Sequence, residues 1–318
     1  MKTPAFWNSV NLISNLLLPL GHIYAAATAC RVKKTPRHAD KKVICIGNLT
    51  AGGTGKTPTA LAVADILQQN GFNPYFVSRG YGGKLKDLIV DPKIHTATEV
   101  GDEPLLLAQK AKVSINPERY EAARKAIADG ADCIIMDDGF QNPTLFKDLS
   151  LLVFDGEVGI GNGRPVPAGP LRENFAEGLK RADAAVILGQ DRHNLAAKLG
   201  TLPTFYGKTV PIVPTDVQHP VLAFAGIGRP EKFYASLREC RLSVRRCINF
   251  PDHHFYTTAE LQQLIDSAKK ENLTIFTTGK DFVKIPAPLR PHFRVLEIGI
   301  KWQNPDELTK FILSRIRN

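Results

Sequence analysis

The chain has 318 residues, of which 43% are hydrophobic and 23% charged, a composition typical of a globular protein long enough for two domains. Its formal net charge of +10 indicates an anionic partner, such as a nucleotide or an acidic membrane surface. No zinc-finger, RNA-recognition or helix-turn-helix signature accompanies this charge, so we expect no nucleic-acid partner. The five cysteines form no C-x-x-C pair, which argues against zinc and favours small buried side chains in a reducing compartment.

Residues 1–32 contain an apolar segment, and a basic stretch from Arg31 to Lys42 follows it. Polar residues and a proline interrupt the segment at Asn8, Asn11, Asn15 and Pro19. They argue against a membrane-spanning helix, which needs about 20 predominantly apolar residues. A signal peptide ending near Cys30 is a further interpretation, but the nucleotide-binding loop described next argues against export. We expect residues 5–30 to form an interfacial helix on an anionic membrane; the alternative is a helix docked on its own domain.

A glycine-rich loop between a strand and a helix is the most informative feature of the sequence. The apolar run Val43–Gly47 predicts a buried strand, and Thr57–Asn70 has the pattern of a helix. Between them lies a loop that predicts nucleoside triphosphate binding, formed by Thr50, Ala51, Gly52, Gly53, Thr54, Gly55, Lys56 and Thr57. Here Lys56 would neutralise phosphate oxygens and the Thr57 hydroxyl would ligate magnesium. One departure from the strict motif is Thr50, where a glycine is usual.

Strand-like runs and helical patterns alternate along the rest of the chain. The further strands that we expect are Tyr75–Ser78, Cys133–Met136, Leu151–Phe154, Ala184–Leu188, Val221–Ala225, Cys247–Phe250 and Thr274–Thr277. Helices are expected at Pro117–Asp129, Pro230–Glu239 and Thr258–Lys270. The proline-spaced stretch Pro203–Pro220 is either a linker or a paired-strand connection. The fold class is therefore α/β, with a mostly parallel P-loop NTPase-type sheet, helices on both faces, a second smaller α/β domain and a membrane-associated N-terminal helix. We expect the boundaries 1–32, 33–205 and 206–318.

Three groups of polar residues could carry chemistry. Asp137 and Asp138 follow an apolar strand, as in a Walker B segment that delivers a carboxylate to magnesium; the alternative is a strand-end aspartate that caps a turn. Asp102 and Glu103 precede a helix, where they serve either as base and metal ligand or only as complements to the helix dipole. His253 lies in the loop FPDHH, ahead of a capping box formed by Thr257 and Glu260, and is either catalytic or a surface residue.

Several motifs occur in a characteristic order: GNLTAGGTGKTP, SRGYGG, GDEP, PERY, DDGFQ, PAGPLRE, FPDHH and TTGKD. Together they resemble the tetraacyldisaccharide 4′-kinase family over almost the whole chain. The family's own loop has the form GNLTxGGTGKT, which accounts for Thr50.

The resemblance implies a role for individual residues. Lys56 would serve the phosphates, with Thr57, Glu103 and Asp137 around the metal ion. Asp102 resembles the general base and His253 its assistant. The family's active-site or substrate-side positions are occupied by Tyr81, Asp138 and Arg172. Many family members have histidine where this chain has Asn142, so a catalytic role at that position is in doubt.

The resemblance also implies a function. It predicts an ATP- and Mg²⁺-dependent kinase that phosphorylates the 4′-hydroxyl of a tetraacylated glucosamine disaccharide 1-phosphate in lipid A biosynthesis. We expect a monomer on the cytoplasmic face of the bacterial inner membrane. The alternatives are a P-loop kinase or ligase acting on a soluble small molecule and a membrane-recruited GTPase-type switch. The switch predicts an N-K-x-D tetrapeptide, but the chain has no Asn-Lys pair and only T-G-K-D at Thr278–Asp281.

Overall fold

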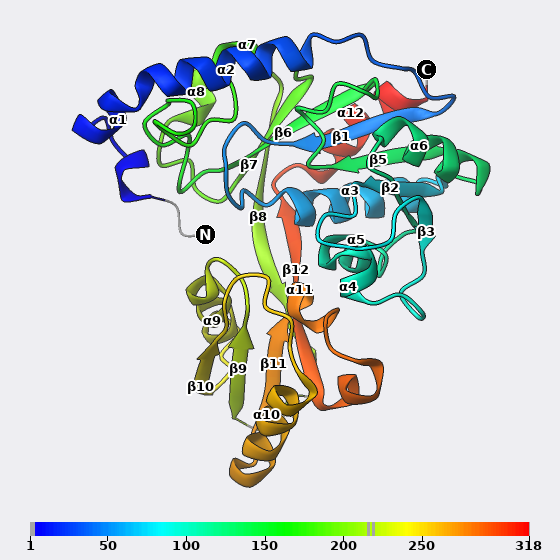
Figure 1. The fold of residues 1–318 in the computed structure, drawn as a ribbon, viewed down its shortest axis with the longest axis vertical. Helices are drawn as coiled ribbons and strands as arrows, with labels where there is room; N and C mark the ends of the chain where they lie inside the picture. The colour runs from blue at the N-terminus through cyan, green and yellow to red at the C-terminus, as the bar shows by residue number, and fades with distance from the viewer. Residues whose placement is uncertain (1–3, 215–216, 218–219, 318) are drawn as a thin grey trace.

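The computed structural model describes residues 4–214, 217 and 220–317. Its described residues form a sheet of twelve strands in the order β10-β9-β11-β12-β8-β7-β6-β1-β5-β2-β4-β3. Figure 1 shows this sheet running through a larger and a smaller half, with β8 and β12 crossing from one half to the other.

The larger half is built on parallel strands. Their bounds are β1 (Lys42–Gly47), β2 (Pro74–Ser78), β4 (Val113–Ile115), β5 (Cys133–Asp137), β6 (Leu149–Asp155), β7 (Ala184–Leu188) and β8 (Thr204–Ile212), with β3 (Leu88–Val90) antiparallel at the edge. The apolar runs predicted as strands before residue 190 are confirmed. Because β1, β5 and β7 are buried on both faces, their sequences are almost continuously apolar.

Helices cover both faces of this part of the sheet, as predicted. They are α3 (Lys56–Gln69), α4 (Ala97–Val100), α5 (Asp102–Leu107), α6 (Arg119–Ala128), α7 (Phe175–Leu179), α8 (Leu195–Leu199) and α12 (Pro305–Ile316). One core joins α3 and α12 to the sheet through side chains such as Val63 and Ile312, and the other joins α6 and α8 through Ala123 and Leu195. The last helix of the chain therefore completes a core that starts with β1.

The smaller half continues the same sheet beyond β8, through β12, β11, β9 and β10. Its elements are β9 (Val221–Ala225), α9 (Pro230–Glu239), β10 (Val244–Asn249), α10 (Thr258–Glu271), β11 (Thr274–Thr278), α11 (Gly279–Phe282), η2 (Ala287–His292) and β12 (Phe293–Trp302). β8 pairs antiparallel with β12, from Gly207 opposite Trp302 to Ile212 opposite Glu297. The paired-strand interpretation of the stretch after Pro203 is thus confirmed for its described residues, and the expected boundary after residue 205 lies inside β8.

The N-terminal apolar segment consists of three short helices instead of one continuous helix. They are η1 (Ala5–Trp7), α1 (Leu12–Leu16) and α2 (Leu18–Val32). Asn11 caps α1 by accepting from the Ser14 amide, and Pro19 lies in the first turn of α2, so polar and proline residues divide the segment. No helix among the described residues is both long and apolar enough to cross a membrane. α2 lies at the end of the larger half farthest from the smaller half (Figure 1).

Candidate active site

The phosphate loop follows the buried strand β1 and ends at the first turn of α3. Gly55 is the N-cap of α3 with φ +93°, in the left-handed region. A Cβ at this glycine would lie 2.3 Å from Leu188 Cδ1, so both the backbone angle and the close packing on β7 require glycine. The backbone N–H groups at the start of α3 have no intrahelical carbonyl to pair with, so this helix end is suited to bind an anion.

A neighbouring loop, residues 165–173, braces the phosphate loop through its backbone. The Ala51 amide donates to Pro170 O at 2.7 Å, and the Arg172 amide donates to Leu49 O at 2.7 Å. Inside the loop, buried Asn48 donates through Nδ2 to Thr50 O and to Thr54 Oγ1. Thr50, the departure from the strict motif, is therefore part of a fixed loop conformation, with its backbone bridged to Leu171.

The carboxyl end of β5 brings Asp137 to the start of α3. Thr57 Oγ1 donates to Asp137 Oδ2 at 2.9 Å. Burial, and secondly the charge of Glu103, raise the pKa of Asp137 to about 6. The other oxygen, Oδ1, is buried and has no hydrogen-bond partner within the part of the chain that the structure describes. An unpartnered buried carboxylate oxygen beside a threonine hydroxyl fits a divalent cation, since magnesium prefers oxygen ligands.

Asp138, the residue after Asp137, contacts two cations. Its Oδ1 lies 2.8 Å from Arg172 NH1 and 3.7 Å from Lys56 Nζ. Burial alone would raise the pKa of Asp138, but Lys56 and Arg172 outweigh it and hold this pKa below its usual range. Burial lowers the pKa of Lys56, and Asp138 opposes that shift. Asp138 thus holds Lys56 and Arg172 in one charged group.

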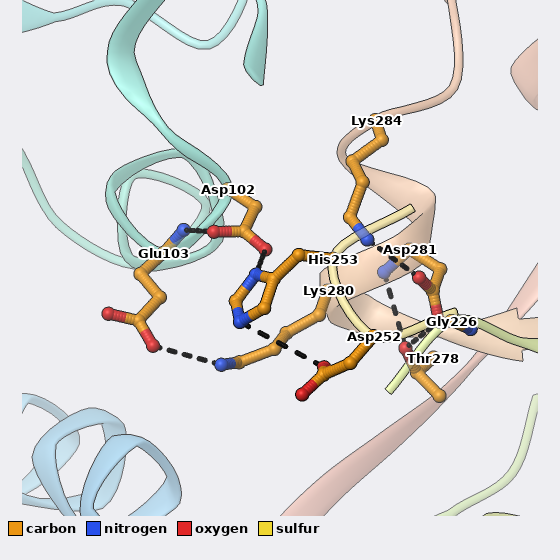
Figure 2. A network of polar contacts seen from close by, with 9 residues as sticks. All are labelled: Asp102, Glu103, Gly226, Asp252, His253, Thr278, Lys280, Asp281 and Lys284. Carbon is orange, nitrogen blue, oxygen red and sulfur yellow. Dashed lines mark hydrogen bonds and ion pairs between the residues drawn. The ribbon is translucent and has the colours of Figure 1, made fainter. Parts of the chain in front are cut away.

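Asp102 and His253 meet across the two halves of the molecule (Figure 2). His253 Nδ1 lies 3.0 Å from Asp102 Oδ2, while the second carboxylate oxygen accepts from the Glu103 amide at 2.9 Å. Asp102 is the first residue of α5, and His253 lies in the loop after β10 with φ +60°, a conformation that is costly outside glycine. The predicted pairing of the GDEP and FPDHH motifs is present in the structure.

The loop that carries His253 is anchored through Gly226 to a buried ion pair between Asp281 and Lys284. The His253 amide donates to Gly226 O, and the Gly226 amide donates to Asp281 Oδ2 at 3.0 Å. Asp281 in turn pairs with Lys284 at 2.9 Å, and both side chains are almost completely buried. His254, the neighbouring histidine, contacts Glu260 and stacks on Phe250, so it is a structural residue.

Glu103, expected at the metal ion, is paired with a residue that the sequence did not assign to the site. Lys280 Nζ donates to Glu103 Oε1 at 2.9 Å (Figure 2). Burial alone would lower the pKa of Lys280, but Glu103 and then Asp102 outweigh it and raise this pKa. The lysine belongs to the TTGKD motif, which is one of the motifs shared with the family but was assigned no role at the site.

The remaining expected residues lie around this centre. Tyr81 is 79% exposed, and its backbone oxygen would be 2.5 Å from a Cβ on Gly101, so it lies against the start of α5. Asn142 accepts from the Thr144 amide and hydroxyl, which is a turn-stabilising role. Arg119 was given no role, yet it is buried, and burial followed by the charge of Arg79 lowers its pKa to about 10. The PERY motif was the signal for it.

A phosphate loop at the end of a buried parallel strand, a strand-end aspartate beside its threonine and a carboxylate–histidine pair are together typical of a P-loop kinase. A family model described as tetraacyldisaccharide-1-P 4′-kinase matches residues 13–317, and the chain belongs to this family. The family suggested by the ordered motifs is thereby confirmed.

Individual relatives agree with the family match. A tetraacyldisaccharide 4′-kinase of Rhodospirillum centenum is 48% identical over 98% of this chain and 96% of its own length. That of Gluconobacter oxydans is 44% identical over 96% of this chain and 95% of its own length. Among solved structures, the "apo" form of LpxK from Aquifex aeolicus in complex with ATP is 27% identical, with a TM-score of 0.79, and the match covers 96% of this chain and all of that one.

Proposed function

We propose that this kinase transfers the γ-phosphoryl group of ATP to the 4′-hydroxyl of a tetraacylated glucosamine disaccharide 1-phosphate, a step of lipid A biosynthesis. The observation that carries the proposal is the 3.0 Å contact between Asp102 and His253 at the phosphate-loop side of the molecule. The names of the relatives and the ATP bound to the Aquifex aeolicus structure support the donor and the acceptor.

The phosphate loop would hold the nucleotide. Thr50, Ala51, Gly52, Gly53, Thr54 and Gly55 would present backbone to the phosphates, Lys56 would neutralise their charge, and the start of α3 would add its positive dipole end. Thr57, Glu103 and Asp137 would hold Mg²⁺, which supplies charge neutralisation for the phosphate oxygens when bound.

Asp102 would accept the proton of the attacking 4′-hydroxyl. A lone carboxylate with an ordinary pKa of about 4 is a weak base for a sugar alcohol. His253 would share that proton through Nδ1, which already faces the carboxylate, while the Gly226 and Asp281 network holds its loop in place. Asp138, Arg172 and Tyr81 would line the side on which the disaccharide enters.

The smaller half, which we assign to the residues after 205 except α12, since α12 packs in the core of the larger half, would close over this site. His253 and Lys280 of this half contact Asp102 and Glu103 of α5, so the catalytic groups assemble only when the two halves are together. Closure would also exclude water and limit wasteful hydrolysis of the nucleotide. Because the whole proposed site comes from one chain, we expect the kinase to act as a monomer.

The N-terminal segment would bind the cytoplasmic face of the inner membrane. Leu12, Leu16 and Ile23 are 83%, 79% and 67% exposed, which is unusual for large apolar side chains that follow one another in a segment. The basic residues from Arg31 to Lys42 would be attracted to anionic lipid. A lipid acceptor would require the enzyme to bind the membrane, which this apolar and basic segment would allow. A soluble acceptor would not require such a segment.

A transfer assay tests the proposal. The parent, with Mg²⁺ and radiolabelled ATP, should label a tetraacyldisaccharide 1-phosphate in mixed micelles and leave the deacylated disaccharide unlabelled or nearly so. Lys56→Ala should lose transfer by orders of magnitude while its circular dichroism matches that of the parent, because Lys56 neutralises charge that moves during transfer. Labelling of a soluble sugar in preference to the lipid would overturn the proposal.

A further inference from the structure

The structure contains a second lysine beside the proposed reaction centre, contributed by the smaller half. Lys280 extends from α11 toward α5, where its Nζ contacts Glu103 (Figure 2). We propose that Lys280 is a further catalytic residue, which donates a hydrogen bond to the γ-phosphoryl group during its transfer. The inference rests on the proposed function and adds a cation that the phosphate loop does not provide.

The backbone that carries Lys280 is firmly placed. Thr278 caps α11 by accepting from the Asp281 amide at 3.2 Å, and Asp281 belongs to the buried network under His253. A Cβ on Gly279 would lie 3.0 Å from Leu106 Cδ1, so α11 approaches α5 closely at this point. The lysine therefore starts from a fixed position directly opposite Asp102 and Glu103.

The end of the side chain, in contrast, can change partner. The Lys280 and Glu103 side chains are 33% and 44% exposed, and an ion pair with that degree of exposure contributes little to stability. The pair between Lys284 and Asp281 is 2% and 0% exposed, and breaking it would leave a buried charge. Lys280 lies in α11 and Lys284 follows it. Of these two lysines, Lys280 is the one that can exchange its carboxylate partner for a phosphate oxygen at a small cost in free energy.

The chemistry favours that exchange. An ammonium group has three donors, and Glu103 uses one of them. The transferring phosphoryl spreads its charge over three equatorial oxygens, and cations aimed at them supply most of the catalysis in this reaction class. Lys56 approaches from the phosphate loop, so a lysine from the smaller half would complete the charge only in the closed molecule, in the manner of an arginine finger.

Substitution of Lys280 tests its role. Lys280→Met removes the charge, Lys280→Arg keeps it, and Lys270→Met on exposed α10 is the matched control. Transfer to the lipid disaccharide gives kcat and KM. Separately, the dissociation constants of ADP and of the non-hydrolysable analogue AMP-PNP, both with Mg²⁺, report contact with the γ-phosphoryl without any turnover. Lys280→Gln replaces Lys280→Met if the circular dichroism of the latter differs from that of the parent.

We expect Lys280→Met to lower kcat about 100-fold or more, to leave KM for the disaccharide nearly unchanged, and to weaken AMP-PNP about tenfold relative to ADP. Lys280→Arg should retain most of both properties, and Lys270→Met should match the parent. Equal weakening of ADP and AMP-PNP, or a kcat within threefold of the parent, would overturn the inference. If the parent itself labels no disaccharide, the proposed function fails, and the nucleotide comparison still decides the role of Lys280.

Discussion

His253 Nδ1 and Asp102 Oδ2 are 3.0 Å apart although 151 positions separate the two residues. The Asp102 side chain is 13% exposed and that of His253 is 52% exposed, so the carboxylate is sheltered while the imidazole is half open to solvent. This arrangement suits a carboxylate base that is fixed in place and an imidazole partner that shares the proton it accepts.

Asp102→Ala and His253→Ala should each lower kcat by about 10²- to 10⁴-fold, the range for a positioned proton acceptor. The double variant should be little worse than the poorer single variant, because groups that act as a unit are not additive. A double-mutant cycle on kcat, with a pH–rate profile for each variant, is the measurement. His254→Ala is the matched control, since its contacts are with Glu260 and Phe250. Independent, multiplicative losses would leave Asp102 as a lone base.

The raised pKa of Asp137, about 6, makes the stability of the metal-free enzyme depend on pH. The folded state keeps this proton to a higher pH than the unfolded chain, so the associated stability is present below about pH 4 and is lost as the pH rises to about 6. Urea unfolding in EDTA should therefore show a loss on the order of 2 to 3 kcal/mol that Asp137→Asn lacks. Exposed Asp40→Asn is the control, and parallel curves for the parent and Asp137→Asn would contradict the expectation.

Gly55→Ala should destabilise the nucleotide-free enzyme by about 1 to 3 kcal/mol, because the new Cβ meets Leu188 and the backbone has φ +93°. Gly53→Ala is the comparison within the same loop, since nothing lies within 4 Å of a Cβ there. Its effect on unfolding should stay within about 0.5 kcal/mol. Urea unfolding of both variants decides the matter, and equal losses would count against the packing argument.

The exposed apolar side chains of α1 should determine membrane binding. Leu16→Asn should lower partitioning into anionic vesicles about tenfold, by removing on the order of 1 kcal/mol of apolar burial in the interface. Ile94→Asn, also on a strongly exposed side chain at 70%, should have no effect. Binding should weaken with added salt, and transfer to the lipid should fall more than background ATP hydrolysis. Equal partitioning of the two variants would refute the assignment.

Local sequence patterns were sufficient for the longer buried parallel strands, such as β1, β5 and β7, and for the phosphate loop. A buried strand such as β5 needs a short apolar run, and glycine followed by Lys56 and Thr57 is a pattern confined to neighbouring positions. The pairing of β8 with β12 was less accessible, because it joins Thr209 to Ile300 and depends on everything folded between them. The three-residue strands β3 and β4 were missed because so short a run has no recognisable period.

The site divides in the same way. Lys56 and Thr57 follow from the loop itself, whereas the pairing of Asp102 with His253 was expected only through the family motifs. The TTGKD motif did not indicate the contact between Glu103 and Lys280, because a lysine next to an aspartate looks like any solvated charge pair. The position of this contact depends on how closely α11 packs on α5.

The packing of α12 has a consequence for how the protein is made. Leu308 and Ile312 share one core with Ile44 and Ile46, which support the phosphate loop. A nascent chain on the ribosome would carry the nucleotide motif long before the helix that completes its hydrophobic support is synthesised. Until then β8 also has no β12 with which to pair. An apolar face and an open strand edge are therefore exposed during translation. Loss of the last helix should therefore produce an aggregating protein, although every catalytic residue would still be present.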